Sequence, residues 1–74
     1  MNQFVIKLFQ QFSLYPAAVN LVLNHLADTV DDEGVAALVR DSWTQLTETL
    51  LLCQNIEIRG NLSKLLSSFR LHIS

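Results

Sequence analysis

The chain has few of the residues that small folds use for extra stability. Its 74 residues include one cysteine, one proline and two glycines. A single cysteine, Cys53, excludes an internal disulfide, and His25 and His72 lie too far apart in sequence to predict a metal site. Two glycines exclude a glycine-rich loop that cradles phosphates. We therefore expect neither a metal nor a cofactor.

Charged residues are also scarce. They make up 16% of the chain, whereas about 25% is typical, and a free-standing domain normally carries more surface charge. A chain this short forms one domain at most and buries only about 60% of the surface that its unfolded form exposes. We expect one helical domain over residues 1–74, either whole or a piece of a longer solenoid. Another protein or a second copy is expected to cover part of its apolar surface.

Little in the sequence would attract nucleic acid, a membrane or a small substrate. The net charge is −2, and the five Lys and Arg residues are scattered, so no basic face is predicted. No apolar run approaches the ~18 residues of a membrane span, and Lys7 within the apolar N-terminal stretch argues against a signal peptide. A chain this short can hardly enclose a pocket of roughly 300 Å³. We expect a non-enzyme without a small-molecule substrate.

Cys53 continues an apolar helical stripe and has no histidine near it in sequence. It is predicted to be a small hydrophobic residue rather than a nucleophile. A lone cysteine without a secretory signal favours a reducing, intracellular compartment, either cytoplasmic or nuclear.

The charges are unevenly distributed along the chain. Acidic residues crowd the stretch 28–33, and Arg59, Lys64, Arg70 and His72 lie near the C-terminus. This distribution would favour head-to-tail contacts, but the charge preferences of helix ends explain it equally well. The acidic stretch lacks the alternating oxygen ligands and closing glutamate of a calcium loop, so a helix junction is predicted there.

The periodicity of apolar residues predicts an all-α fold of three to four short amphipathic helices, arranged as a helical repeat or a small bundle. The first helix, over residues 2–12, has its apolar face at Phe4, Val5, Leu8, Phe9 and Phe12. Pro16 suits a helix start, and the second helix, over residues 16–28, has a stripe of Val19, Val22, Leu23 and Leu26. Leu21 adds apolar surface on another side, so we expect this helix to be covered on several sides.

A third helix is predicted over residues 32–54, with Asp31 or Thr29 as its N-cap. Its stripe is Val35, Val39, Ser42, Trp43, Leu46, Leu50 and Cys53. A fourth helix follows Gln54 and Asn55, with one apolar side made of Ile58, Leu62, Leu65, Leu66, Phe69 and Ile73. Gly60 marks either the start of this helix or a close approach of two backbones. The alternative is one helix over residues 35–71.

The order of these segments resembles an armadillo or HEAT helical repeat. The stretch Pro16-Ala17-Ala18-Val19-Asn20-Leu21-Val22 looks like the short second helix of an armadillo repeat. Residues 32–54 are similar to its long third helix, and residues 55–62 look like the junction to the next repeat. Roughly one and a half repeats fit, whereas about three are needed for a continuous core. The resemblance therefore implies a piece of a longer solenoid, or a core completed by self-association.

The resemblance departs from the family at one position that matters for binding. Peptide-binding armadillo proteins carry a tryptophan on the third helix and an asparagine one turn later. Trp43 matches the first position, but Thr47 stands where the asparagine is expected. Threonine cannot offer both the donor amide and the acceptor carbonyl that clamp a peptide backbone. The departure argues against the family's extended-peptide mode.

Three groups of residues are candidates for contacting a partner. Trp43 is a typical interface residue but also lies beside the core stripe. A second group shares the polar face of the third helix at steps of three and four: Arg40, Thr44, Thr47 and Leu51. The third group is Phe4, Phe9 and Phe12, which serve either as anchors in a partner's groove or as core.

Two functions follow from this pattern. The first is a non-catalytic protein–protein interaction module that acts through apolar helix faces. In it, the second and third helices form the central core, and the first or fourth reaches across to another chain. The alternative is a structural homo-oligomerisation domain, a dimeric helical bundle.

Overall fold

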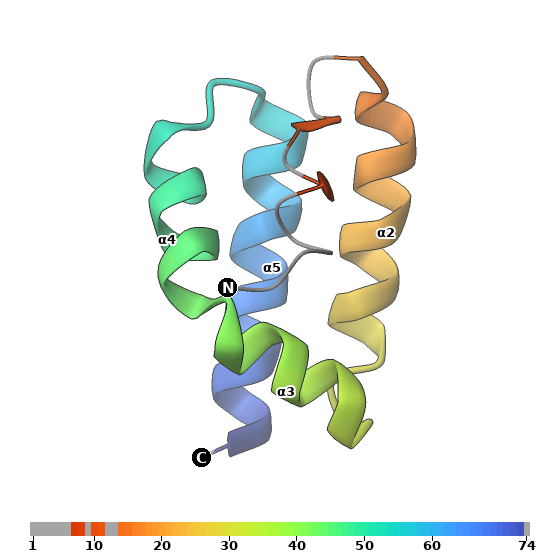
Figure 1. Cartoon of the computed structure of the whole chain (residues 1–74), viewed down its shortest axis with the longest axis vertical. Coiled ribbons are helices and arrows are strands. Elements are labelled where there is room, and N and C mark those ends of the chain that lie inside the picture. The colour runs from red at the N-terminus through yellow and green to blue at the C-terminus, as the bar shows by residue number, and fades with distance from the viewer. Residues whose placement is uncertain (1–6, 9, 12–13, 74) are drawn as a thin grey trace.

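The computed structural model describes residues 7–8, 10–11 and 14–73. Four helices follow one another there and keep the labels of Figure 1: α2 (Pro16–Asp28), α3 (Glu33–Asp41), α4 (Trp43–Leu52) and α5 (Ile56–Ile73). Helices α2, α4 and α5 run lengthwise, and α3 crosses near one end of them (Figure 1). The part of the chain that is described contains no strand. The predicted all-α class is therefore confirmed.

The first predicted helix falls largely outside the described residues. Lys7, Leu8 and Gln10 are helical, and Leu8 is buried within the hydrophobic core. The candidate partner residues Phe4, Phe9 and Phe12 lie outside the described part of the chain, so their predicted role stays a prediction.

Helix α2 begins and ends where the sequence predicts. Pro16 occupies the first turn, where its fixed φ and missing N–H cost nothing. At the other end the Thr29 hydroxyl donates to the His25 carbonyl at 2.7 Å. Val19, Leu23 and Leu26 are buried as expected, but Leu21 is 73% exposed. The prediction that this helix is covered on several sides is therefore wrong, because α2 packs mainly against α5 at the edge of the bundle.

The single third helix predicted over residues 32–54 is wrong, and so is the alternative over residues 35–71. The chain bends at Ser42, whose backbone (φ −106°, ψ 10°) separates α3 from α4. The Ser42 N–H still donates to the Leu38 and Val39 carbonyls at 3.2 Å, and the Ser42 carbonyl accepts from Leu46 N–H at 2.9 Å. Hydrogen bonding thus continues almost unbroken through the bend, so no local sequence signal marks it. The bend lets α3 cross the bundle while α4 returns alongside α5 (Figure 1).

Side-chain caps start α3 and α5. Asp32, rather than the predicted Asp31 or Thr29, caps α3, and its Oδ1 accepts from Gly34 N–H at 2.8 Å and Val35 N–H at 3.2 Å. Asn55 Oδ1 accepts from Ile58 N–H at 3.0 Å. Both caps satisfy backbone donors that a helix start leaves unpaired.

The sequence had led us to expect that Gly60 either starts α5 or marks a close approach of two backbones, and it does neither. It lies inside the helix, and a Cβ added there would meet no atom within 4 Å among the described residues. The glycine therefore has no steric reason visible in this fold.

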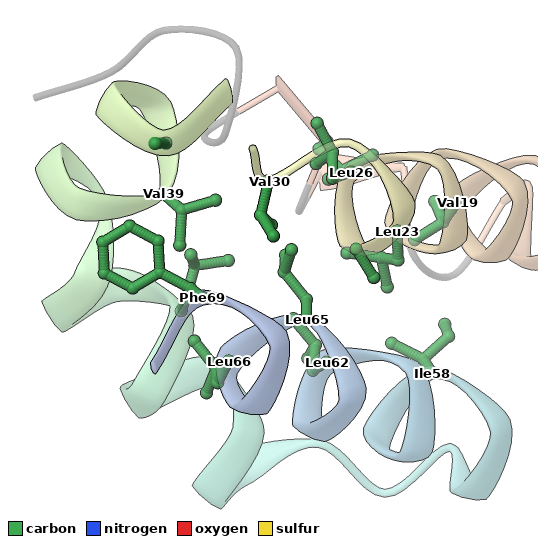
Figure 2. Packing of buried hydrophobic residues seen from close by; sticks show 14 residues of the cluster. Val19, Leu23, Leu26, Val30, Val39, Ile58, Leu62, Leu65, Leu66 and Phe69 are labelled. Carbon is green, nitrogen blue, oxygen red and sulfur yellow. The ribbon is translucent and has the colours of Figure 1, made fainter. Parts of the chain in front are cut away.

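Helix α5 is the centre of the core, which corrects the expectation that the second and third helices are central. It contacts α2, α3 and α4. Its buried residues are those predicted, except that Ile73 is exposed: Ile58, Leu62, Leu65, Leu66 and Phe69. Figure 2 shows Ile58 and Leu65 pointing from α5 toward α2, and Phe69 lying beside Val39 of α3. Helix α5 is central because it is the longest helix and lies between α2 and α4.

Candidate interaction surfaces

A polar seam joins α2 to α5. Asn61 Nδ2 donates to Asn20 Oδ1 at 2.7 Å, and Lys64 Nζ donates to Asn24 Oδ1 at 3.1 Å. Lys64 Nζ also lies 3.8 Å from Asp28 Oδ1. The residue numbers rise together on the two helices, so α2 and α5 run parallel. The sequence analysis missed this seam, although three polar residues spaced four apart on α2 were a visible signal.

The bend at Ser42 divides the predicted polar face. Arg40 lies in α3, whereas Thr44, Thr47 and Leu51 lie in α4. Thr47 is half-buried, and its hydroxyl donates to the Trp43 carbonyl at 3.0 Å and to the Thr44 carbonyl at 2.9 Å. Its single donor hydrogen is therefore shared between two carbonyls of its own helix. The four residues therefore do not lie on one helix.

Trp43 packs partly against the core. It is half-buried against the hydrophobic core, and its ring lies 5.5 Å from that of Phe69 between centroids, at an interplanar angle of 43°. This distance is within the range of a favourable aromatic pair. The contact ties the start of α4 to α5, which is the core position that the stripe on the third helix predicts.

Arg40 borders a groove between α3 and the last turns of α5. The groove has a volume of about 300 Å³, and seven residues line it: Glu33, Ala36, Ala37, Arg40, Phe69, His72 and Ile73. We call it the α3–α5 groove. It is open to solvent, so it does not test the expectation that so short a chain can hardly enclose a pocket of this size. The bend at Ser42 produces it, because α3 is turned across α5 rather than along it.

A cluster of large aliphatic side chains lies where α4 passes into α5. Leu51 and Leu52 are 75% and 81% exposed at the end of α4, and Ile56 is 89% exposed at the start of α5. We call these three residues the apolar tip. Of the three consecutive leucines 50–52, only Leu50 packs against the core. Leu14 and Tyr15, also exposed, precede α2 at this same end of the bundle (Figure 1).

Charged residues lie near both surfaces. Glu48, Glu57 and Arg59 are exposed near the apolar tip. Arg40, His72 and Glu33 line the groove. Arg40 Nε lies 3.9 Å from Asp41 Oδ1, and both side chains are about two-thirds exposed, so this ion pair is weak.

The described residues contain no group of three His, Cys, Asp or Glu side chains placed to hold a metal ion. Cys53 is half-buried, and its Sγ donates to the Asn55 carbonyl at 3.5 Å. Within the same residues, no helix combines the length and the hydrophobicity needed to cross a membrane.

The fold and its surfaces define a small all-α bundle with an apolar tip at one end and a groove toward the other. Comparison with protein-family models, with curated proteins and with solved structures finds no significant match. The resemblance to armadillo or HEAT repeats stays a prediction. The segment likened to the long third helix is divided here between α3 and α4.

Proposed function

We propose that this chain is a non-catalytic protein–protein interaction module that docks through the apolar tip. The observation that carries the proposal is the clustering of Leu51, Leu52 and Ile56, each at least three-quarters exposed, beside a core that is closed without them. Single exposed apolar residues are common on protein surfaces. Contiguous ones are typical of interaction sites.

The size of the tip sets the strength of binding that it supports. Burying three such side chains contributes about 5–9 kcal/mol at most, whereas association costs about 4–15 kcal/mol before any contact is made. The tip alone therefore supports weak binding. A partner that also covers Leu14 and Tyr15, at the same end of the bundle, gains enough apolar contact for a stable complex.

A pull-down with matched variants tests this function. Leu51→Asp changes the tip, and Leu21→Asp makes the same chemical change at an equally exposed site on α2, with 75% and 73% of the respective side chains exposed. Proteins retained from cell extract by the wild type and by Leu21→Asp, but lost with Leu51→Asp, support the proposal. If all three retain the same proteins, the tip is not the docking surface. Circular dichroism melts confirm that both variants are folded.

Homo-oligomerisation remains the second candidate function. The observation that favours it is the α3–α5 groove, a hollow of the same chain whose lining is partly apolar. Light scattering of the isolated chain over a concentration series separates the two functions. A mass that stays at 8.4 kDa throughout removes the second.

A further inference from the structure

We propose that two copies of this chain form a domain-swapped dimer, in which the bend at Ser42 straightens and α2 with α3 of each copy packs onto α4 and α5 of the other. The partner is a second copy, and the surfaces that meet are those of the core itself. The inference goes beyond the proposed function and does not rest on it, because it involves the bend and the α2–α5 contact rather than the apolar tip.

The segment on both sides of the bend has the pattern of one helix. Between Glu33 and Leu52 the sequence has no proline, and its one glycine is Gly34, in the first turn of α3. A single apolar stripe with helical spacing passes through Ser42. Its members on the two sides are buried or half-buried against the core: Val35, Val39, Trp43, Leu46 and Leu50. A continuous helix over this range therefore keeps the same residues on one face.

The Ser42 side chain lacks, in the bent chain, a hydrogen bond that a continuous helix supplies. It is 1% exposed, and its Oγ has no hydrogen-bond partner among the described residues. In a helix interior a serine or threonine hydroxyl can donate to the carbonyl four residues earlier, as Thr47 does to Trp43 within α4. Straightening places the Leu38 carbonyl in that position for Ser42. The unpaired hydroxyl thus disfavours the bent form relative to the straight one.

Straightening also completes the backbone hydrogen bonds between α3 and α4. Across the bend, bonds of helical spacing run from the Ser42 N–H to Leu38 and from the Leu46 N–H to Ser42. A continuous helix adds those from the N–H groups of residues 43–45 to the carbonyls four residues earlier. Local interactions therefore favour a straight helix, and only the packing of α3 across the bundle opposes it.

Within one copy, a straight helix would separate α2 from α5. In Figure 1, α4 runs from the bend toward its connection with α5, so α3 in line with α4 would extend past the opposite end of the bundle. Its nine residues would carry Glu33 about 14 Å beyond Ser42. Val30 is buried in the core, and the three residue steps from it to Glu33 span at most about 11 Å. Val30 would therefore be drawn out of the core, and α2 with it.

Once α2 leaves, α5 exposes a face that is specific for α2. Leu62 and Leu65 lose the cover of the α2 stripe, and Asn61 loses the 2.7 Å hydrogen bond to Asn20. The α2 of a second copy supplies the same stripe and the same amide, whereas another apolar surface would leave the amide without its partner. Each copy has one α2–α3 half and one α4–α5 half, so reciprocal exchange satisfies both copies and stops at a dimer.

Matched substitutions at the bend test the exchange by sedimentation velocity of the full chain over a concentration series. The wild type is expected to form a dimer. Ser42→Ala and Ser42→Gly both remove the hydroxyl, but glycine disfavours a helix interior. A swapped dimer contains two straightened bends, whereas each monomer is bent at this residue. The dissociation constant of the Ser42→Ala dimer is therefore expected to be roughly thirtyfold lower than that of the Ser42→Gly dimer.

Ser67→Ala and Ser67→Gly are the control pair. Residue 67 is an exposed position of α5, which is helical in both the monomer and the dimer, so these two variants should have equal dissociation constants. Equal constants for the two Ser42 variants would overturn the proposal. Wild-type and Ser42→Ala chains that stay monomeric at every concentration would overturn it as well.

A disulfide between copies locates the exchange even if a Ser42 variant does not fold. One chain carries Asn20→Cys and the other Asn61→Cys, both with Cys53→Ser, and the two are unfolded and refolded together before oxidation. In the swapped dimer, residue 20 of one copy meets residue 61 of the other, as the two asparagines meet in the structure. A covalent heterodimer is expected. Asn20→Cys mixed with Ser67→Cys is the control and should give far less of it.

Dimers in sedimentation that give no more of the 20–61 disulfide than the control pair would show that copies associate through their outer surfaces, and the exchange would be wrong. The Leu51→Asp pull-down decides the proposed function separately, since that substitution leaves Ser42 and the α2–α5 contact unchanged.

Discussion

Asn61 donates a 2.7 Å hydrogen bond from Nδ2 to Asn20 Oδ1 across the contact between α2 and α5. Asn20 is buried, at 5% exposed, on the same helix face as the core residues Val19 and Leu23. A polar pair inside a helix–helix contact favours one register, since sliding either helix by a turn would leave a buried amide without its partner. The pair therefore selects the alignment of α2 on α5 that the leucines alone leave open.

Removing one member of this pair is expected to be costly. Asn61→Ala should lower the free energy of unfolding by about 1–3 kcal/mol, because the Asn20 amide stays buried without this partner. Urea unfolding of Asn20→Ala, Asn61→Ala and the double variant measures the coupling. The double variant should lose less than the sum of the two single losses. Strictly additive losses would show that the two amides do not interact.

Ser42→Ala is expected to stabilise the protein. Ser42 is 1% exposed, and its Oγ has no hydrogen-bond partner among the described residues. A buried hydroxyl without a partner costs about 1–3 kcal/mol, and a gain of 1 kcal/mol raises the Tm of a domain this size by about 4–8 °C. Ser67→Ala, on the exposed side of α5, is the control and should give only the smaller gain from helix propensity. A lower Tm for Ser42→Ala would contradict the prediction.

The two glycines should respond differently to alanine. Gly60→Ala should raise the free energy of unfolding by about 1 kcal/mol, since the added Cβ meets no atom of the described residues within 4 Å. Gly34→Ala should gain less or lose stability, because its Cβ would lie 3.1 Å from the capping Oδ1 of Asp32. Thermal melts of both variants decide the point. Equal gains in stability would mean that the Asp32 side chain moves away from the added Cβ without weakening the cap of α3.

The N-cap of α3 is Asp32 in the structure, whereas the sequence predicted Asp31 or Thr29. Substituting the two aspartates in turn distinguishes the two assignments. Asp32→Ala removes the acceptor of two backbone N–H groups and should cost about 1 kcal/mol. Asp31→Ala, at an exposed position before the cap, should change stability by less than about 0.5 kcal/mol. Chemical denaturation of both variants measures the difference. A larger loss for Asp31→Ala would restore the sequence-based assignment.

The candidate interaction residues were only partly predictable. Leu51 stands out in sequence because an apolar residue interrupts a polar helix face, and it belongs to the apolar tip. Leu52 and Ile56 carry no such signal, because near a helix end the apolar pattern of the sequence does not distinguish a residue that packs inward from one that points outward. Arg40 was grouped with Leu51 through helical spacing alone, and that grouping fails because the helix bends between them.

Periodicity and turn chemistry in the sequence determined the all-α class, the bounds of α2 and the buried side of α5. These features depend on neighbours three and four residues apart, whose contacts the chain's own order specifies. The bend at Ser42, the central place of α5, the Asn20–Asn61 pair and the α3–α5 groove were decided by tertiary structure alone. A serine is compatible with a continuing helix, and the sequence separation of 41 between Asn20 and Asn61 leaves no local trace of their contact. Only packing α3 across the bundle, so that its apolar face reaches α5, makes the bend favourable and creates the groove beside it.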